Sequence, residues 1–349
     1  MKCTIKEIAL ELGMSRNTVA KVLSGKSGVS PKTKTLVLEK AREMHYQFGQ
    51  SDHEQEKSAS AQEHEESHNS ILFLTRTSFN YSDFWIKVMK GIETVLKENN
   101  YNLVLGVMDD QDIQRLNFPN IIHHSDIKGI ILVELCEQKI CNEVLKFHLP
   151  TVTLDMPKNY MHFLDKMDII TMENKIHIRQ ITASLIRKGC RRFAFAGNLS
   201  GNNVSRGFQE RYEALCETLA ENQLSLVREC CFFDETDQLF LNSAYIVNKL
   251  KSFSELPEVY ICGNDWTAIQ LINALQLLNY RIPQDVSVVG FDDIQAATKI
   301  KPALTTIRTD KEYLGIASAN CILNRIRNAE TPFVYAQYMT KLILRDSTL

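Results

Sequence analysis

The chain has 349 residues, a formal net charge of −2, 44% hydrophobic residues and 23% charged residues. This length corresponds to roughly two or three domains of about 100–200 residues, and the composition is ordinary for a globular protein. No run of about 18 apolar residues is present, so the sequence predicts no membrane-spanning helix. The N-terminal stretch alternates charged with apolar residues, and we therefore expect no signal peptide.

The near-neutral total hides a strong asymmetry along the chain. Residues 1–46 contain seven lysines and two arginines against four glutamates, a net charge of +5, whereas residues 47–69 have a net charge of −5. A small basic module attached to a neutral or acidic body indicates an anionic polymer as partner. Nine cysteines at irregular spacings predict reduced thiols in a cytoplasmic protein. The Cys230–Cys231 pair lacks histidine at ligand spacing, so we expect no zinc, and no cofactor.

Residues 1–46 read as three short helices. The first covers about residues 5–11, with Thr4 as N-cap and Glu7 completing a capping box, and it ends at Gly13. Ser15 is expected to cap the second helix, which runs to about residue 23, and the third begins at residue 31 after a serine cap. Their inward faces are predicted to carry Ile5, Ile8, Ala9, Leu12, Val19, Val22, Leu23, Leu36, Val37, the stem of Lys40, Ala41 and Met44.

Residues 47–69 differ from both neighbouring segments. Phe48 is their only large apolar residue, and a stretch of this kind cannot bury enough surface to offset the entropy of ordering. We therefore expect a flexible acidic linker.

From residue 70 to residue 349, apolar strand patterns alternate with amphipathic helix patterns. The strand patterns are SILFLT, YNLVLGV, KGIILVEL, PTVTLDM, RRFAFAG, ECCFFD, EVYICGND and DVSVVGFDD. Repeated β-α-β units form parallel sheets that are covered on both faces, so the fold class is α/β. About 280 residues exceed one core, which predicts two subdomains.

A helix, a glycine-containing turn and a second helix form helix-turn-helix geometry, in which the second helix presents its N-terminal residues to the major groove. Arg16 can donate to guanine and Asn17 can pair with adenine. Ser15 and Thr18 suit phosphate, and Lys21 suits either role. The predicted DNA-binding residues are Thr4, Ser15, Arg16, Asn17, Thr18 and Lys21. The alternative is a helical hairpin with solvated charge, which the basic charge and the helix caps disfavour.

Other motifs in the chain carry weaker signals. SGKSG at residues 24–28 lacks the earlier glycine and the preceding strand of a phosphate-binding loop. No dinucleotide fingerprint, nucleophile elbow or metal-binding helix pattern is found, so the sequence indicates no enzyme.

Polar residues follow several strands and suit a small polar ligand, because ligands of parallel sheets bind at the carboxyl ends of the strands. Asp155, Asn264 and Asp292 hold such positions. Helix capping is the alternative for asparagine and aspartate there. Phe84 and Trp85, after the first strand, can stack on a ring, and core packing is their alternative.

The sequence resembles the lac repressor/galactose repressor family of bacterial transcription regulators. The resemblance rests on TIKEIALELGMSRNTVAKVLSGKSGVSPKTKTLVLEKAREMHY, on LPTVTLDMP, on ITASLIRKGCRRFAFAG and on the long segment from GNDWTAIQ to TDKEYLG. It implies a three-helix DNA-binding headpiece followed by a two-lobed core like that of periplasmic sugar-binding proteins, a homodimer, and an effector between the lobes. By motif position, Arg16, Asn17 and Lys21 would read operator bases with Thr18 on the backbone. The effector site would comprise Phe84, Trp85, Asp155, Asn264 and Asp292.

The sequence departs from the family pattern in two places. The family continues after the tyrosine matching Tyr46 with Pro-Asn and Ala-Arg-x-Leu, a hinge helix whose leucine enters the minor groove, whereas residues 47–69 contain no Leu, Ile, Val or Met. Phe208 stands where the family has an effector-binding arginine, and Arg206 or Arg211 is the candidate substitute.

These observations predict a homodimeric regulator, a repressor by family prevalence, that binds double-stranded operator DNA and a small effector, expected to be a carbohydrate or a derivative. The alternative is a small-molecule-binding protein with a degenerate headpiece and no specific operator.

Overall fold

The computed structural model describes residues 4–23, 29–44, 69–76, 83–135, 137–157, 159–199, 206–233 and 242–349. The chain divides into two compact units, Met1–Glu66 and Ser67–Leu349, which are considered separately below. The expected linker, apart from Asn69, and the SGKSG segment lie outside the described residues.

The N-terminal unit contains the three expected helices, α1 (Ile5–Glu11), α2 (Arg16–Leu23) and α3 (Pro31–Glu43). A small apolar core joins them, because each helix buries residues against the other two. The buried members of this core are Ile8, Ala9, Val19, Val22, Val37 and Ala41.

Hydroxyl side chains begin all three helices, as predicted. Thr4 and Glu7 form a capping box at the start of α1. The Ser15 Oγ accepts a hydrogen bond from the Thr18 backbone N–H at 3.1 Å, and a serine one residue before α3 caps that helix in the same way. These bonds satisfy backbone donors that a helix leaves unpaired in its first turn.

The prediction that Leu36 faces inward is wrong. Its side chain is 46% exposed, and Leu38 packs against the apolar core instead. The buried face of α3 is centred on Val37 and Ala41, which are one helical turn apart, and it extends toward Leu38 rather than Leu36.

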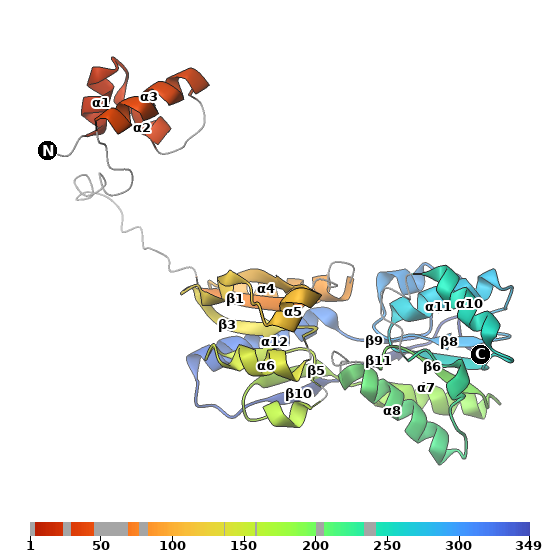
Figure 1. Ribbon diagram of the computed structural model, residues 1–349. Helices are drawn as coiled ribbons and strands as arrows, with labels where there is room; N and C mark the ends of the chain where they lie inside the picture. Colours follow the sequence, from red (N-terminus) through yellow and green to blue (C-terminus); the bar gives the residue numbers. More distant parts are fainter. Residues whose placement is uncertain are drawn as a thin grey trace. The chain divides into compact units, whose positions relative to one another are not determined.

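The second unit has two lobes, each built around a parallel sheet (Figure 1). Lobe 1 has a six-stranded parallel sheet in the order β10-β5-β4-β3-β1-β2. Its strands are β1 (Ser70–Arg76), β2 (Asn102–Met108), β3 (Ile127–Leu132), β4 (Thr151–Thr153), β5 (Asp168–Met172) and β10 (Tyr335–Tyr338). Lobe 2 has a parallel sheet in the order β6-β7-β8 and an antiparallel pair. Its strands are β6 (Phe193–Ala196), β7 (Val259–Cys262), β8 (Ser287–Val289), β9 (Thr306–Arg308) and β11 (Lys341–Ile343).

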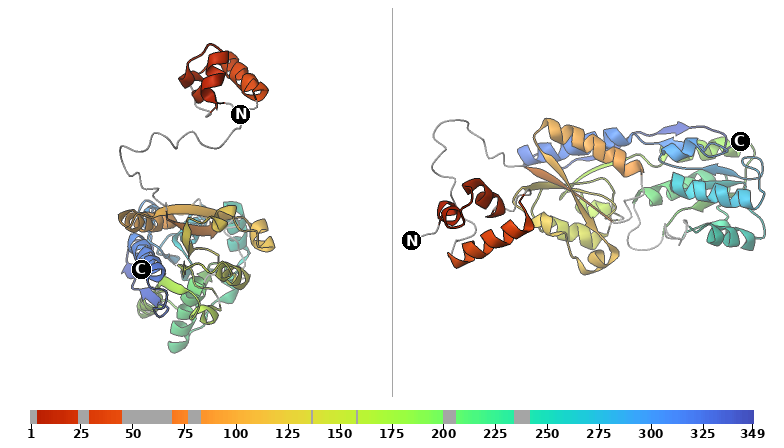
Figure 2. Two further views of the ribbon diagram at one scale, coloured as in Figure 1. Left: turned by 90° about the vertical axis from the view of Figure 1, so that its left-hand side faces the viewer. Right: turned by 90° about the horizontal axis from the view of Figure 1, so that it is seen from above.

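Helices cover the sheets of both lobes. In lobe 1 these are α4 (Asp83–Glu98), α5 (Asp110–Arg115), α6 (Gln138–Leu145) and α12 (Lys311–Arg327), with 3-10 turns η2 (Asn120–His123) and η3 (Tyr160–Phe163). In lobe 2 they are α7 (Ile176–Arg187), α8 (Arg206–Glu221), α10 (Ser243–Ser252) and α11 (Asp265–Leu277), with η4 (Arg228–Cys230) and η5 (Gln295–Thr298). Figure 2 shows α4 and α12 lying side by side although more than 200 residues separate them. The two-subdomain prediction is confirmed.

The chain crosses between the lobes three times, after β5, after β9 and after β10, so neither lobe is a continuous segment. Each crossover begins directly after a strand of one of the sheets. Residues near these crossovers therefore lie where the two lobes meet.

The predicted strand ECCFFD is largely absent. Its first residues belong to η4, and only Phe232 pairs with a strand, through a single bridge to Ala196. The seven cysteines within the described residues are free thiols, with Cys230 and Cys231 buried. Among the same residues, no helix is long and apolar enough to span a membrane.

Candidate functional site

The second helix of the N-terminal unit presents polar side chains away from the apolar core. Arg16, Asn17 and Lys21 are exposed, while Val19 and Val22 anchor the opposite face at 0% and 4% exposure. The Ser15 and Thr18 hydroxyls lie 2.8 Å apart at the N-terminus of this helix. The structure thus places the predicted recognition residues together on the outer side and the first turn of α2.

Thr4 lies at the start of α1 rather than on α2. Its backbone N–H and hydroxyl both donate to the Glu7 carboxylate, at 2.8 and 3.0 Å. These bonds lower the pKa of Glu7. The contacts fix the N-terminus of α1, so the capping role of Thr4 is visible in the structure and a DNA contact stays a prediction.

In the second unit, acidic side chains from both lobes surround Arg211 on α8. Burial lowers the pKa of this guanidinium, and the negative charges of Asp292, Asp155, Glu210 and Asp265 oppose that shift. Asp155 follows β4 in lobe 1, and Asp292 follows β8 in lobe 2. Two of the predicted effector residues, from distant parts of the chain, therefore lie within electrostatic reach of one arginine.

Asp292 is held in an unusual backbone conformation, with φ at +111°. Its backbone N–H donates to the Ile307 carbonyl at 2.8 Å. Burial raises the pKa of its carboxyl to about 6, although the nearby charges of Arg211 and Lys311 lower it. Burial likewise raises the pKa of Asp265 beneath this loop to about 8, and Asp265 accepts from the Ile294 backbone N–H at 2.8 Å.

Asn264 and Asp155 already have partners within the protein. The Asn264 Oδ1 accepts from the Thr267 N–H at 2.9 Å, so this residue caps α11 as the alternative interpretation expected. The Asp155 Oδ2 accepts from the Glu134 N–H at 3.0 Å. Both residues are partly exposed, and effector contact by either one remains a prediction.

Phe84 and Trp85 belong to the main apolar core, with 5% and 6% exposure. Their rings meet edge to face at 4.7 Å. The Trp85 indole N–H donates to Glu134 Oε1 at 2.7 Å, and the Lys311 Nζ lies 5.5 Å from the Phe84 ring centre. Core packing, the alternative for both rings, accounts for these contacts, and stacking on a ligand remains a prediction.

The structure separates the two candidate arginines of α8. Arg206 joins a surface network and forms a bidentate pair with Glu213, at 2.9 and 3.1 Å. Arg211 is 5% exposed and donates to Asn174 Oδ1 at 3.0 Å and to the Gly263 carbonyl at 2.5 Å. Its guanidinium stacks 3.5 Å from the centre of the Phe291 ring. Arg211 is thus the arginine that reaches the junction between the lobes.

Phe208, which stands where the family has its arginine, fills space beside Gly263. A Cβ on Gly263 would lie 2.3 Å from this ring, so only glycine allows the approach. Phe208 and Arg211 are three residues apart and share one face of α8. That spacing is the sequence signal that could have selected Arg211 over Arg206.

Sequence reasoning also missed Lys311, the first residue of α12. This side chain is 5% exposed, and its ammonium donates to the Asp292 carbonyl and, at 3.4 Å, to the Asp293 carbonyl. Burial lowers its pKa, and the charge of Asp292 opposes the shift. The TDKE pattern after β9 could have indicated a cation at this lobe junction. Within the described part of the chain, no group of three or more His, Cys, Asp or Glu residues could hold a metal.

Two family models match the chain. Residues 4–47 match the model of bacterial regulatory proteins of the lacI family, and residues 182–348 match a periplasmic binding protein-like domain. The chain is 26% identical over 346 residues to the ribose operon repressor of Haemophilus influenzae, covering 99% of this chain and 98% of the relative. It is also 26% identical over 352 residues to the probable HTH-type transcriptional repressor ExuR of Bacillus subtilis, with coverage of 99% and 98%.

Solved structures share the fold. A complex of the transcriptional regulator CelR with cellobiose has a TM-score of 0.70 at 21% identity and covers 99% of this chain and 100% of that one. The lac repressor dimer bound to operator and the anti-inducer ONPF has a TM-score of 0.66 at 19% identity and covers all of both chains. A regulator of Enterococcus faecium with bound ribose has a TM-score of 0.65 at 22% identity over 79% of this chain and 98% of that one.

Proposed function

We propose that this chain is a member of the lacI family of bacterial regulatory proteins, whose model matches residues 4–47 and whose curated relatives match along nearly the whole chain. It is a DNA-binding transcriptional repressor, and its family consists of regulators rather than enzymes. A small molecule bound between the lobes of the second unit controls its binding to operator DNA. The observation that carries this proposal is the exposed polar face of α2 in the basic segment 1–46, which a two-lobed core follows later in the chain.

The N-terminal unit reads the operator through α2. Arg16 donates to guanine in the major groove, Asn17 pairs with adenine, and Lys21 reads a base or a phosphate. Ser15 and Thr18 bind a phosphate at the positive N-terminus of the helix. Thr4 contacts the backbone from the N-terminus of α1. The exposure of these residues, all but the half-buried Thr18, supports the assignment.

The effector is a polyhydroxylated molecule, a sugar or a derivative. Asp155 and Asp292 accept hydrogen bonds from its hydroxyl groups, and Arg211 donates to it. Asn264 and the rings of Phe84 and Trp85 complete the set carried over from the family. Ribose in one similar structure and cellobiose in another support this ligand class.

The regulator acts as a homodimer in the cytoplasm, where its operator is, and two headpieces bind two half-sites. The lac repressor in the similar structure is a dimer on its operator. We place the DNA-binding headpiece at residues 1–46, the acidic linker at 47–69 and the effector-binding and dimerising core at 70–349.

The proposal is tested by replacing Arg16 with alanine. Genome-wide footprinting first yields the operator, and fluorescence anisotropy then measures the affinity of both proteins for that operator and for single-base variants. Loss of one guanine contact should weaken operator binding by roughly 1–3 kcal/mol and relax base preference at one position.

Arg115→Ala, which removes an exposed arginine from lobe 1, is the matched control and should leave the affinity unchanged. A wild-type protein with no preference among duplexes would support the alternative, a small-molecule-binding protein with a degenerate headpiece.

A further inference from the structure

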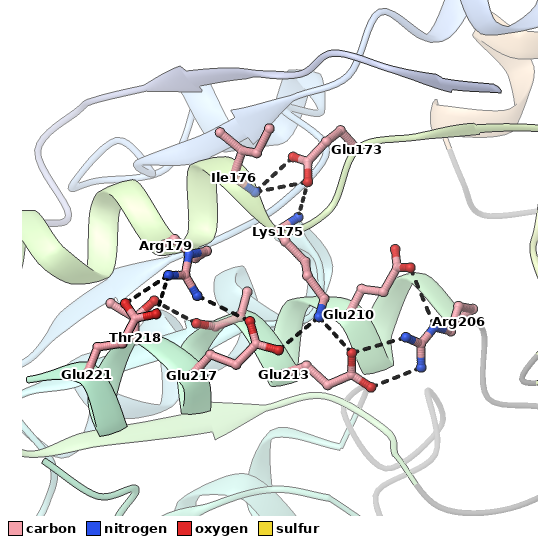
Figure 3. Close-up of polar contacts among 11 residues, drawn as sticks. Glu173, Lys175, Ile176, Arg179, Arg206, Glu210, Glu213, Glu217, Thr218 and Glu221 are labelled. Atoms are coloured by element: carbon pink, nitrogen blue, oxygen red, sulfur yellow. Dashed lines mark hydrogen bonds and ion pairs between the residues drawn. The ribbon is translucent and has the colours of Figure 1, made fainter. Parts of the chain in front are cut away.

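A line of polar contacts connects the surface of lobe 2 with Arg211. Arg206 lies at its outer end, then Glu210, then Asn174, and Arg211 lies at the inner end (the surface part is drawn in Figure 3). Glu210 and Asn174 are 7% and 2% exposed. Buried polar groups of this kind are costly unless they are hydrogen-bonded, so each member has a fixed set of partners.

Asn174 connects Glu210 with Arg211, and its amide can take only one orientation. The Nδ2 donates to the Met172 carbonyl at 3.0 Å and to Glu210 Oε2 at 2.9 Å. The Oδ1 is thereby left to accept from Arg211 Nε at 3.0 Å. If the amide flipped, its NH2 group would face the Arg211 donor, and the Met172 carbonyl and the Glu210 carboxylate would each lose their hydrogen-bond donor. Glu210 therefore fixes which end of Asn174 faces Arg211.

The surface ion pairs hold Glu210 in place. Its Oε1 lies 3.4 Å from Arg206 Nε, and Arg206 is itself held by Glu213, which also pairs with Lys175 at 2.9 Å. Figure 3 shows this row continuing along α8 to Glu217 and Glu221. Exposed pairs of this type contribute little stability individually, but a network restricts the side chains it contains.

Arg211 is fixed on several sides as a result. Nε donates to Asn174, one Nη to Gly263 and the other Nη contacts the Met172 sulfur at 3.8 Å, while the Phe291 ring covers one face of the guanidinium. Met172 ends the last strand before the first crossover, and Gly263 follows β7 in lobe 2. The plane of the guanidinium is thus defined by groups on both sides of the lobe junction.

We propose that Glu210 and Asn174 are positioning residues that fix the guanidinium plane of Arg211 for effector recognition. This inference rests on the proposed function, in which Arg211 donates to the effector. The two residues act through Arg211 and need not touch the effector, since preorganised donors bind more tightly than mobile ones.

The positioning is tested without any effector, by NMR of protein labelled with 15N-arginine. The Arg211 Nε–H resonance, assigned by its absence in Arg211→Lys, reports exchange of this proton with water. Glu210→Ala should accelerate that exchange at least tenfold, whereas Glu210→Gln, which keeps an acceptor for Asn174, should restore near-wild-type exchange. Glu217→Ala, which removes a carboxylate of the same row that does not reach Asn174, is the matched control. Unchanged exchange in Glu210→Ala would overturn the proposal.

A second background separates positioning from a general structural role. In Asn174→Asp, the new carboxylate still accepts from Arg211 but cannot donate to Glu210, and the two carboxylates repel. Adding Glu210→Ala to this background should leave Nε–H exchange unchanged or slow it. In the protein that retains Asn174, the same substitution should accelerate the exchange. The same acceleration in both backgrounds would mean that Glu210 does not act through Asn174. In the double variant a carboxylate at position 174 still accepts from Arg211. Its Nε–H exchange can therefore be compared with that of Asn174→Asp even if Glu210→Ala alone does not fold.

A separate measurement addresses the effector role. Release of operator by D-ribose and by cellobiose is titrated for wild type, Arg211→Lys and Glu210→Ala. For a sugar that releases the operator from wild type, both variants should need at least a tenfold higher sugar concentration. If the NMR results hold but Arg211→Lys responds like wild type, the proposed effector role of Arg211 fails while the positioning stands. If neither sugar releases the operator, the result counts against these sugars as effectors and not against the positioning.

Discussion

Asp292 joins a left-handed backbone conformation to a perturbed carboxyl group. Its pKa is raised to about 6, chiefly by burial, against an ordinary value near 3.8. Folding therefore favours the protonated form of this carboxyl relative to the unfolded chain. Between about pH 4 and pH 6 the folded state binds more protons than the unfolded state, so the contribution of this group to stability falls as the pH rises through that window.

This sign leads to a pH-dependent prediction for Asp292→Asn. The amide cannot ionise, so the variant should gain stability relative to wild type as the pH rises from 4 to 7. A shift of this size corresponds to about 3 kcal/mol, and we expect about 1 kcal/mol because the residue is partly exposed. Urea unfolding at several pH values measures the difference. A difference that does not change with pH would show that the carboxyl titrates normally.

Some of the candidate site residues could be predicted from the sequence and others could not. Arg16, Asn17 and Lys21 could be predicted because a helix-turn-helix fixes which positions face outward. The three-residue spacing from Phe208 points to Arg211 rather than Arg206, but the contacts that decide the choice are with Asn174 and Gly263, which are distant in sequence and approach α8 only in the folded lobe. Phe84 and Trp85 were ambiguous for a related reason, since an aromatic residue after a strand suits a core as well as a ligand.

At the scale of elements, α4 and α12 pack against each other at very short range. A Cβ on Gly91 would lie 2.0 Å from the Glu312 carbonyl oxygen, and a Cβ on Gly315 would lie 2.0 Å from the Val88 carbonyl oxygen. The two helices therefore touch through their backbones at both glycines. No larger residue fits at either position without separating the helices.

Gly91→Ala tests this contact, because two effects predict opposite signs. Helix propensity alone predicts a gain of about 0.5–1 kcal/mol for alanine over glycine. Steric overlap with a carbonyl group predicts a net loss of about 1–3 kcal/mol, and we expect this loss to dominate.

Chemical denaturation measures the change, and Thr94→Ala on the exposed face of α4 is the control, with an expected change below about 0.5 kcal/mol. A stabilised Gly91→Ala protein would mean that the helices can move apart at little cost.

The helices and most strands could be predicted because hydrophobic period and capping residues are local signals. The α4–α12 contact could not, because its two glycines lie 224 positions apart in one sequence. ECCFFD has the composition of a strand, yet η4 takes up its first residues. Leu36 was misplaced for a smaller reason, a rotation of one position around a short helix whose buried face is narrow.

At the scale of the whole molecule, the prediction concerns how two headpieces bind one operator. The 23 residues 47–69 carry no Leu, Ile, Val or Met that could enter the minor groove as a wedge. Their composition predicts a flexible linker, and a linker of this kind and length would span roughly 25 Å. We predict that operator DNA is little bent, and that adding one helical turn between half-sites weakens binding only modestly. Gel shifts on spacer variants and a circular-permutation assay measure both quantities. One strictly required spacing with a sharp central bend would instead identify a wedge in this segment, with Phe48 as the candidate.

The order of synthesis gives the discontinuous lobes a further consequence. The helices of the headpiece end at residue 43, whereas β10 completes the sheet of lobe 1 and β11 pairs with β9 near the end of the chain. The buried Ser347 even bonds to Val288 in β8 and to Thr305. At about 5–20 residues per second, the ribosome completes the lobes roughly 15–60 s after it completes the helices of the headpiece. A growing chain therefore carries a folded headpiece that has no partner, and one headpiece alone holds DNA far more weakly than two. The nascent protein should consequently hold its proposed operator only weakly until the last strand is in place.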